Sequence, residues 1–224
     1  MANSYLSRTP SSAGNRQKWT WSAWVKFSQT PGPAGAILFS AYAHGNDNFK
    51  ISLGDTNQIS MRFYNGTEYQ LVPNRRFRDF SAWYHLVIAV DTTQGTASDR
   101  AKLYVNGIQE TSLSTATYPS QNDNTGMFDS GHTTLIGART TGSNPHYFEG
   151  ELGFVAIADG ASLAPTVFGE TDSTTGIWKP ILSPSFTAGT NGALLKFENS
   201  GAMGTDSSGQ SNTFTVGAGT LTQN

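Results

Sequence analysis

The chain has 224 residues, a formal net charge of −2 and no cysteine, so disulfide bonds and zinc sites built on cysteine are excluded. Only 13% of the residues are charged, and the 24 glycines, with many Ser, Thr and Asn, favour short strands and tight turns over long helices. With a pI near 6.0 and scattered charge, the sequence gives no basic patch for a phosphate backbone, so we expect no nucleic-acid partner.

The N-terminal segment 1–18 is polar. It lacks the apolar run of a signal peptide, and no stretch of the chain reaches the ~18 consecutive apolar residues that a membrane-spanning helix needs. We therefore expect no membrane insertion. Tyr5 and Leu6 predict a short edge strand within this segment, and the whole length suits one β-sandwich domain.

Alternating apolar residues predict the strands of the first half. Residues 19–27 (WTWSAWVKF) place Trp19, Trp21, Ala23, Val25 and Phe27 on one face, as in a central core strand. Further strands are expected at 36–41, 49–53, 59–64 and 67–71, the last two joined across Asn65-Gly66.

The stretch from Trp83 to Glu110 organises the predicted sheet. Residues 83–90 and 101–105 both alternate as half-buried strands do. Between the second strand and Ile108 stand only Asn106 and Gly107, which tolerate the positive φ that a two-residue type I′ turn requires. We expect 101–105 to pair with 108–112, and 83–90 to join them in an antiparallel meander.

The second half is less regular. Residues 113–131 lack alternation and are rich in Asn, Asp and Ser, which predicts a long exposed loop. Strands are expected at 132–137 and 147–158, followed by an irregular arm at 164–192 that packs Ile177 and Trp178 onto the sandwich. Residues 193–224 are expected to add the last strands, 193–198 and 213–216, to the same domain.

Several of these segments together resemble a known superfamily. WTWSAWVKF, the FKISLG and ISMRFYNG pair, WYHLVIAVDTT with KLYVNGIQ, HTTLIGA and FEGELGFVAIADGASL are similar to laminin-G-like domains of the concanavalin A-like lectin/glucanase superfamily. The resemblance covers most of residues 5–163. It implies an all-β fold, a two-sheet antiparallel jelly-roll sandwich.

The C-terminal end adds a second likeness. ALLKFENSGAMGTDSSGQSNTFTV resembles the strand, turn and strand that usually begin such a domain, so we expect a circularly permuted closure by the C-terminal strands. Together with SYLSRTPSSAGNRQKWTWSAWVK and FGETDSTTGIWKP, this end resembles domains in virion proteins of aquatic tailed phages, where they occur in tail fibres and surface appendages. That likeness implies a place on the virion surface.

Two functions follow from these resemblances. The first is a virion surface structural protein, a capsid decoration or fibre subunit, with other virion proteins as partners and a homo-oligomeric state such as a trimer. The second is a stand-alone carbohydrate-binding module that recognises host surface glycans. A chain that begins at Met1 without tandem repeats or a coiled-coil shaft favours the first. The polar N-terminal segment and Trp178 are the docking candidates.

We expect no enzyme. Glucanases of the superfamily carry E-x-D-x-x-E on one strand, which aligns carboxylates for nucleophile and acid work. The nearest match, residues 170–175, lacks the final Glu and stands among loop residues. Glu149 and Glu151 share a face of a predicted strand, but without a third carboxylate they are expected at a solvated edge. His85 is expected as a structural strand residue.

Calcium is the candidate cofactor, because relatives in the superfamily bind it through loop Asp and Asn oxygens. The candidate ligands are Asp47, Asp123 and Asp129. The alternative is that such loop residues bond their own backbone in Asx turns. The number of carboxylates is low for a cation that takes about six to eight oxygens.

Tyrosines in predicted loops or turns are the candidates for stacking on sugar rings. They are Tyr42, Tyr64, Tyr69, Tyr118 and Tyr147. The alternative for each is packing at a strand edge, where loop aromatics cover the ends of the core.

Overall fold

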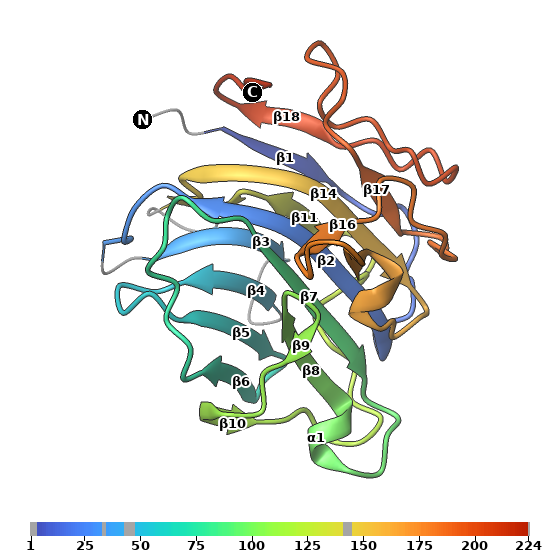
Figure 1. Ribbon diagram of the computed structural model, residues 1–224. Coiled ribbons are helices and arrows are strands. Elements are labelled where there is room, and N and C mark those ends of the chain that lie inside the picture. Colours follow the sequence, from blue (N-terminus) through green and yellow to red (C-terminus); the bar gives the residue numbers. More distant parts are fainter. Residues whose placement is uncertain (1–3, 33–34, 43–47, 141–144, 224) are drawn as a thin grey trace.

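The computed structural model describes residues 4–32, 35–42, 48–140 and 145–223, and its strands form two antiparallel sheets packed face to face (Figure 1). Sheet A has, within these residues, the strand order β10-β6-β5-β4-β3-β11-β1-β18. Its strands are β1 (Tyr5–Arg8), β3 (Ala36–Tyr42), β4 (Asn48–Leu53), β5 (Ile59–Tyr64), β6 (Glu68–Pro73), β10 (Leu113–Thr117), β11 (Thr133–Ile136) and β18 (Thr215–Ala218).

Sheet B has the order β17-β14-β2-β7-β8-β9 in the same described part of the chain. Its strands are β2 (Lys18–Phe27), β7 (Tyr84–Asp91), β8 (Ala101–Val105), β9 (Ile108–Gln109), β14 (Gly150–Asp159) and β17 (Ala193–Leu195). The smaller elements are two strand pairs, β12 (Ala138–Arg139) with β13 (His146–Tyr147) and β15 (Gly169–Thr171) with β16 (Trp178–Pro180), and two short helices, α1 (Ala97–Arg100) and η1 (Pro165–Val167).

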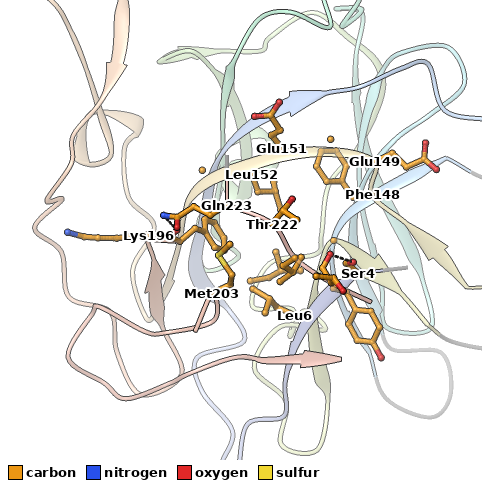
Figure 2. Close-up of a pocket in the computed structure, with 18 of the residues that line it drawn as sticks. Ser4, Leu6, Phe148, Glu149, Glu151, Leu152, Lys196, Met203, Thr222 and Gln223 are labelled. Atoms are coloured by element: carbon orange, nitrogen blue, oxygen red, sulfur yellow. Dashed lines mark hydrogen bonds between the residues drawn. The ribbon is translucent and has the colours of Figure 1, made fainter. Parts of the chain in front are cut away.

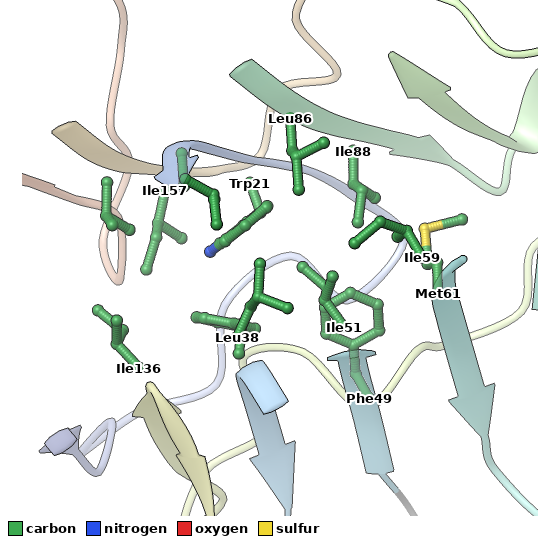
Figure 3. Packing of buried hydrophobic residues seen from close by; sticks show 14 of the residues in the cluster. Trp21, Leu38, Phe49, Ile51, Ile59, Met61, Leu86, Ile88, Ile136 and Ile157 are labelled. Carbon is green, nitrogen blue, oxygen red and sulfur yellow. The ribbon is translucent and has the colours of Figure 1, made fainter. Parts of the chain in front are cut away.

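The core lies between the two sheets and follows the alternation of the strands (Figure 3). β2 runs between β14 and β7, as expected for a central strand, and its alternate residues from Trp19 to Phe27 are buried. Trp19 meets Phe49 of sheet A edge-to-face, with ring centroids 4.8 Å apart. The fold is therefore the all-β, two-sheet antiparallel sandwich that the sequence predicts.

The two Asn-Gly dipeptides behave differently. Asn106 and Gly107 have φ values of 49° and 81°, and they join β8 to β9 as the predicted two-residue turn. At Asn65-Gly66 the prediction of a two-residue turn is wrong, because Tyr64 pairs with Glu68 and leaves three residues in the loop. The Asn65 side chain donates instead to the Asp123 carboxylate over 2.8 Å.

Three further expectations are wrong. Residues 113–131 are not a long exposed loop, because they contain β10, and they bury Met127 and Phe128 in the core. β1 is not an edge strand, since it pairs with both β11 and β18. Ile177 does not pack onto the sandwich, since it is 65% exposed.

The C-terminal strands close both sheets at one side of the sandwich (Figure 1). β17 pairs with β14 at the edge of sheet B, and β18 pairs with β1 at the edge of sheet A. The permuted closure itself stays a prediction, because it concerns the strand order of relatives.

The outer face of sheet B carries a second, smaller core. Val87, Ala156, Phe168 and Leu194 are buried there, packed by side chains of residues 163–186 and by Tyr104. Part of the arm at 164–192 thus covers this face. None of the described helices is long and apolar enough to cross a membrane.

Candidate functional site

A cavity of about 590 Å³ opens at the side of the sandwich that the C-terminal strands close (Figure 2). The cavity forms because part of β14 has no described strand paired with it on one side. β17 pairs with β14 only at Val155–Ile157, and a bulge between Gly153 and Ala156, with Phe154 at a φ of 47°, bends β14 at that point. Within the described residues no strand therefore pairs with that edge of β14 from Gly150 to Gly153, and the cavity forms alongside it.

The inner wall of the cavity is apolar. Both sheets and the segments after β17 and β18 contribute to it, through Leu6, Ile136, Phe148, Leu152, Phe197, Met203 and Leu221. Four of these side chains, Phe148, Leu152, Phe197 and Leu221, also pack against the main core. The cavity is therefore continuous with the main core, because the same side chains line both.

The C-terminal segment closes one side of the cavity. The Ser4 hydroxyl donates to the carbonyl of Thr220 over 2.8 Å, which ties the segment to the residue before β1 of sheet A. The Gln223 amide donates to the carbonyl of Phe197 over 3.1 Å, which ties it to the chain leaving β17. Residues 220–223 thus bridge the two edges.

Charged groups stand at the margin of the cavity. In Figure 2 the charged ends of Glu149, Glu151 and Lys196 point away from its centre. Glu151 forms an ion pair with Lys26 at 3.2 Å, and Glu149 accepts a hydrogen bond from Gln29. The two carboxylates that the sequence assigns to a solvated edge thus lie partly exposed beside the opening, each bonded to a neighbouring side chain.

Trp83 is the exposed aromatic residue of this margin. Its side chain is 40% exposed, and it rests on β14 where Gly153 provides no side chain. A Cβ at Gly153 would lie 3.7 Å from the Trp83 ring, the same distance as from Cβ of Trp24. The margin of the cavity therefore holds one exposed aromatic ring together with carboxylates and an ammonium group.

The five candidate tyrosines do not come together, and none of them lines this cavity. Tyr42 and Tyr64 lie on the outer face of sheet A, since their neighbours Ala41 and Phe63 face the core. Tyr69 and Tyr118 pack against the core, which is the alternative that the sequence left open. Tyr147 lies beside Tyr5, with ring centroids 6.3 Å apart.

The candidate calcium ligands are separated or lie outside the described residues. Asp47 belongs to the undescribed stretch 43–47. Asp123 accepts from Asn65, and Asp129 pairs with Arg16 at 2.5 Å. In the described ranges no three His, Asp or Glu side chains gather into a group that could hold a metal ion. Calcium binding stays a prediction.

Ser22 and His85 are the one described pair that resembles a nucleophile and its base, with Oγ 2.9 Å from Nε2. Nδ1 of His85 accepts a hydrogen bond from the indole of Trp178, which can only donate. Neutral His85 therefore carries its proton on Nε2 and donates to Ser22. Because burial lowers the pKa of His85 to about 3, this imidazole is a structural donor and not a general base.

The motif at 170–175 is also structural. Asp172 accepts hydrogen bonds from the backbone N–H groups of Thr174 and Thr175, and pairs with Lys179 at 2.9 Å. Glu170 lies 3.5 Å from the same ammonium. These carboxylates hold the β15–β16 hairpin together.

Trp178, the candidate docking residue, packs within the chain. Its ring lies against Gly107 and Gly169 and stacks on His85, with centroids 5.9 Å apart. Sequence reasoning missed Trp83, Lys196 and Glu198 as margin residues. The one available signal was a tryptophan at the first position of the predicted strand 83–90, where a large ring is often left partly exposed.

The chain matches one family model and several solved structures. A family model described as "Concanavalin A-like lectin/glucanases superfamily" matches residues 2–168. Among solved structures, a heptameric SAP-like pentraxin from Limulus polyphemus aligns with a TM-score of 0.53 at 14% identity, over 86% of this chain and 88% of that one.

Two other solved structures align with lower scores. Domains LG4-5 of the mouse laminin alpha1 chain give a TM-score of 0.49 at 11% identity, over 70% of this chain and 39% of that one. The CBM40 of the Ruminococcus gnavus IT-sialidase, bound to alpha2,3 sialyllactose, gives 0.45 at 13% identity, over 68% and 89%. No curated protein sequence matches the chain. At these identities the likeness shows the fold.

Proposed function

The chain belongs to the concanavalin A-like lectin/glucanase superfamily, and we propose that it is a carbohydrate-binding domain without enzymatic activity, whose sugar site is the cavity mouth at Trp83. The observation that carries this proposal is an exposed indole in the lining of one opening, whose margin also holds Glu149, Glu151, Lys196 and Glu198.

The chemistry of that opening suits a sugar. The C–H face of a pyranose packs on an aromatic ring, and its hydroxyls donate to carboxylates and accept from ammonium groups. Trp83 supplies the ring, and the Lys26 and Gln29 contacts hold Glu151 and Glu149 in fixed positions before a ligand arrives. A volume of about 590 Å³ lies within the range of small-ligand pockets.

The absence of catalysis is part of the proposal. Glycosidases place two carboxylates on opposite sides of the scissile bond, one as acid and one as base or nucleophile. Glu149 and Glu151 are two residues apart in one chain segment, and both already bond to neighbouring side chains. The proposal predicts binding of a glycan without its cleavage, which product analysis after long incubation checks.

The test is a glycan array probed with the wild-type chain, Trp83→Ala and Tyr64→Ala. Tyr64→Ala removes a partly buried ring from the outer face of sheet A, and Tyr64 does not line the cavity. For neutral glycans on the array, the proposal predicts that binding is lost in Trp83→Ala and kept in Tyr64→Ala. Loss of binding in Tyr64→Ala alone would place the sugar site on the outer face of sheet A instead. A wild-type chain that binds no glycan would contradict the proposed function.

We also propose the location that the sequence resemblance implies, the surface of a tailed-phage virion, where the chain would act as a decoration or fibre subunit with other virion proteins as partners. Its support is the likeness of the N- and C-terminal segments and of FGETDSTTGIWKP to such proteins. Immunogold labelling of purified virions with antibody against the chain tests it, with light scattering of the free chain for the expected homo-oligomer. Unlabelled virions would contradict the location.

A further inference from the structure

Four basic side chains converge on the outer face of sheet A. Lys50 on β4 and Arg62 on β5 are direct cross-strand neighbours. Both face away from the core, because the residues on either side of each are buried in it. Arg139 on β12 and His146 on β13 are likewise paired with each other.

The short strands β12 and β13 lie against β3 at this face. The Ser40 hydroxyl on β3 donates to the carbonyl of Ala138 over 2.8 Å, and the hydroxyls of Tyr42 and Thr140 are 3.0 Å apart. Ser40 is also the cross-strand partner of Lys50. These contacts therefore place Arg139 and His146 near Lys50. The four basic groups therefore come from four strands but share one surface.

Electrostatics shows that these charges act on one another. Burial lowers the pKa of Lys50. The charges of Arg62 and Arg139 lower the pKa of Lys50 further, and the charge of Glu68 raises it in part. Burial likewise lowers the pKa of His146, with Arg139 and Lys50 adding to the effect. Arg62 is held in place by Glu68 at 2.7 Å and lies over the Tyr64 ring at 5.6 Å. Among the described residues, Glu68 thus offsets part of the positive charge gathered here.

We propose that the basic face formed by Lys50, Arg62, Arg139 and His146 is a second binding site, which takes sulfate or carboxylate groups of an acidic polysaccharide. An anion seated among these groups would replace mutual repulsion with charge-assisted hydrogen bonds from an ammonium and two guanidinium groups. The rings of Tyr42 and Tyr64 flank the cluster on the same face of the sheet. The site is distinct from the cavity beside β1 and β18, because none of the four basic residues lines that cavity.

The test uses fluorescein-labelled dextran sulfate, carboxymethyl dextran and neutral dextran, with fluorescence anisotropy in 150 mM salt. The proposal predicts binding of one or both charged polymers and none of neutral dextran. Lys50→Gln combined with Arg139→Gln is expected to weaken binding by about tenfold or more, the loss of one to two charge-assisted contacts. Which charged polymer binds tells sulfate from carboxylate.

The matched control is Lys18→Gln combined with Lys102→Gln, which removes the same charge from sheet B, where these lysines pair with Asp91 and Asp99. The proposal predicts that this variant binds as the wild type does. Equal weakening in both double variants would mean general electrostatic attraction and would overturn the site, as would a wild-type chain that binds neither charged polymer.

A second readout follows the site itself. NMR titration of His146 is expected to show a pKa raised by dextran sulfate, because a bound anion favours the imidazolium that Arg139 and Lys50 disfavour. Trp83→Ala should leave this change intact, so failure of the cavity proposal and failure of the basic face are distinguishable. A His146 pKa that does not move at saturating polymer would contradict the inference.

Discussion

The indole Nε1 of Trp178 lies 3.0 Å from Nδ1 of His85, and this hydrogen bond ties the arm hairpin β15–β16 to the central strand β7 of sheet B. His85 is at the same time stacked on Trp24, with ring centroids 5.0 Å apart, and bonded to Ser22. One buried imidazole thus joins two strands of sheet B and the arm that covers it.

The burial of His85 predicts loss of stability in acid. Its pKa is about 3 in the folded chain, well below the usual value, so between pH 6.5 and pH 3 only the unfolded chain takes up this proton. The resulting stability is present above pH 6.5 and is lost as the pH falls, by up to about 5 kcal/mol at pH 3. Urea unfolding between pH 7 and pH 4.5 measures it.

His85→Gln isolates that effect. His146 also has a lowered pKa and contributes in the same pH range, so His146→Gln is the matched control. Asp91, whose pKa is lowered to about 2, acts only at more acid pH. The steep part of the pH dependence should disappear in His85→Gln and remain in His146→Gln. A slope unchanged in His85→Gln would contradict the assignment.

Trp178 and its neighbour Ile177 should differ sharply when truncated. Trp178→Phe keeps a ring but leaves buried Nδ1 of His85 without its donor, which costs about 1–3 kcal/mol. Trp178→Ala also loses packing on Gly107 and Gly169 and should cost about 3 kcal/mol or more. Ile177→Ala, at a 65% exposed site, should stay within about 0.5 kcal/mol of wild type by urea unfolding. Equal effects at both positions would show that the arm does not depend on this contact.

Gly107 is required by the turn that it forms. Its φ is 81°, and a Cβ there would lie 2.7 Å from the Trp178 ring. Gly107→Ala should therefore destabilise the chain by about 1–2 kcal/mol from backbone strain alone, with a further loss from the displaced ring. Gly95, in an open loop with no atom within 4 Å of an added Cβ, is the control, and Gly95→Ala should leave the thermal midpoint unchanged or slightly raised.

Lys50→Gln should raise stability while it weakens anion binding. Lys50 is charged in both folded and unfolded chains at pH 7, and its lowered pKa means that burial, with Arg62 and Arg139, disfavours this charge in the folded state. Removing the charge removes that unfavourable interaction, so the thermal midpoint should increase. A decrease in the thermal midpoint would show that the Lys50 charge stabilises the fold, and it would argue against a site that needs a bound anion to offset this charge.

The strands were predictable where one face of them is buried. Residues 18–27, 59–64 and 101–105 alternate because every second side chain enters the core between the sheets. The turn at Asn106-Gly107 was predictable because its φ values are set locally. At Asn65-Gly66 the side-chain bond to Asp123, which is distant in sequence, accompanies a three-residue loop instead.

The parts that escaped prediction depend on distant contacts. Met127 and Phe128 are buried in an irregular segment, where no period marks the inward side chains. The cavity exists because β17 ends at Leu195 and β14 bulges at Phe154, two events whose positions meet only in the folded chain. Glu149, Glu151 and Trp83 become one site for the same reason, although 66 positions separate Trp83 from Glu149 in the printed sequence.

Isothermal titration of the best glycan from the array into the wild-type chain and into Trp83→Ala tests the central proposal most directly. Stacking of a sugar ring on one exposed aromatic side chain is worth about 1–2 kcal/mol, so the account predicts a Kd that rises by about five- to thirtyfold from wild type to Trp83→Ala, with the fold unchanged by circular dichroism. An identical Kd in both proteins would contradict the placement of the sugar site at the cavity mouth.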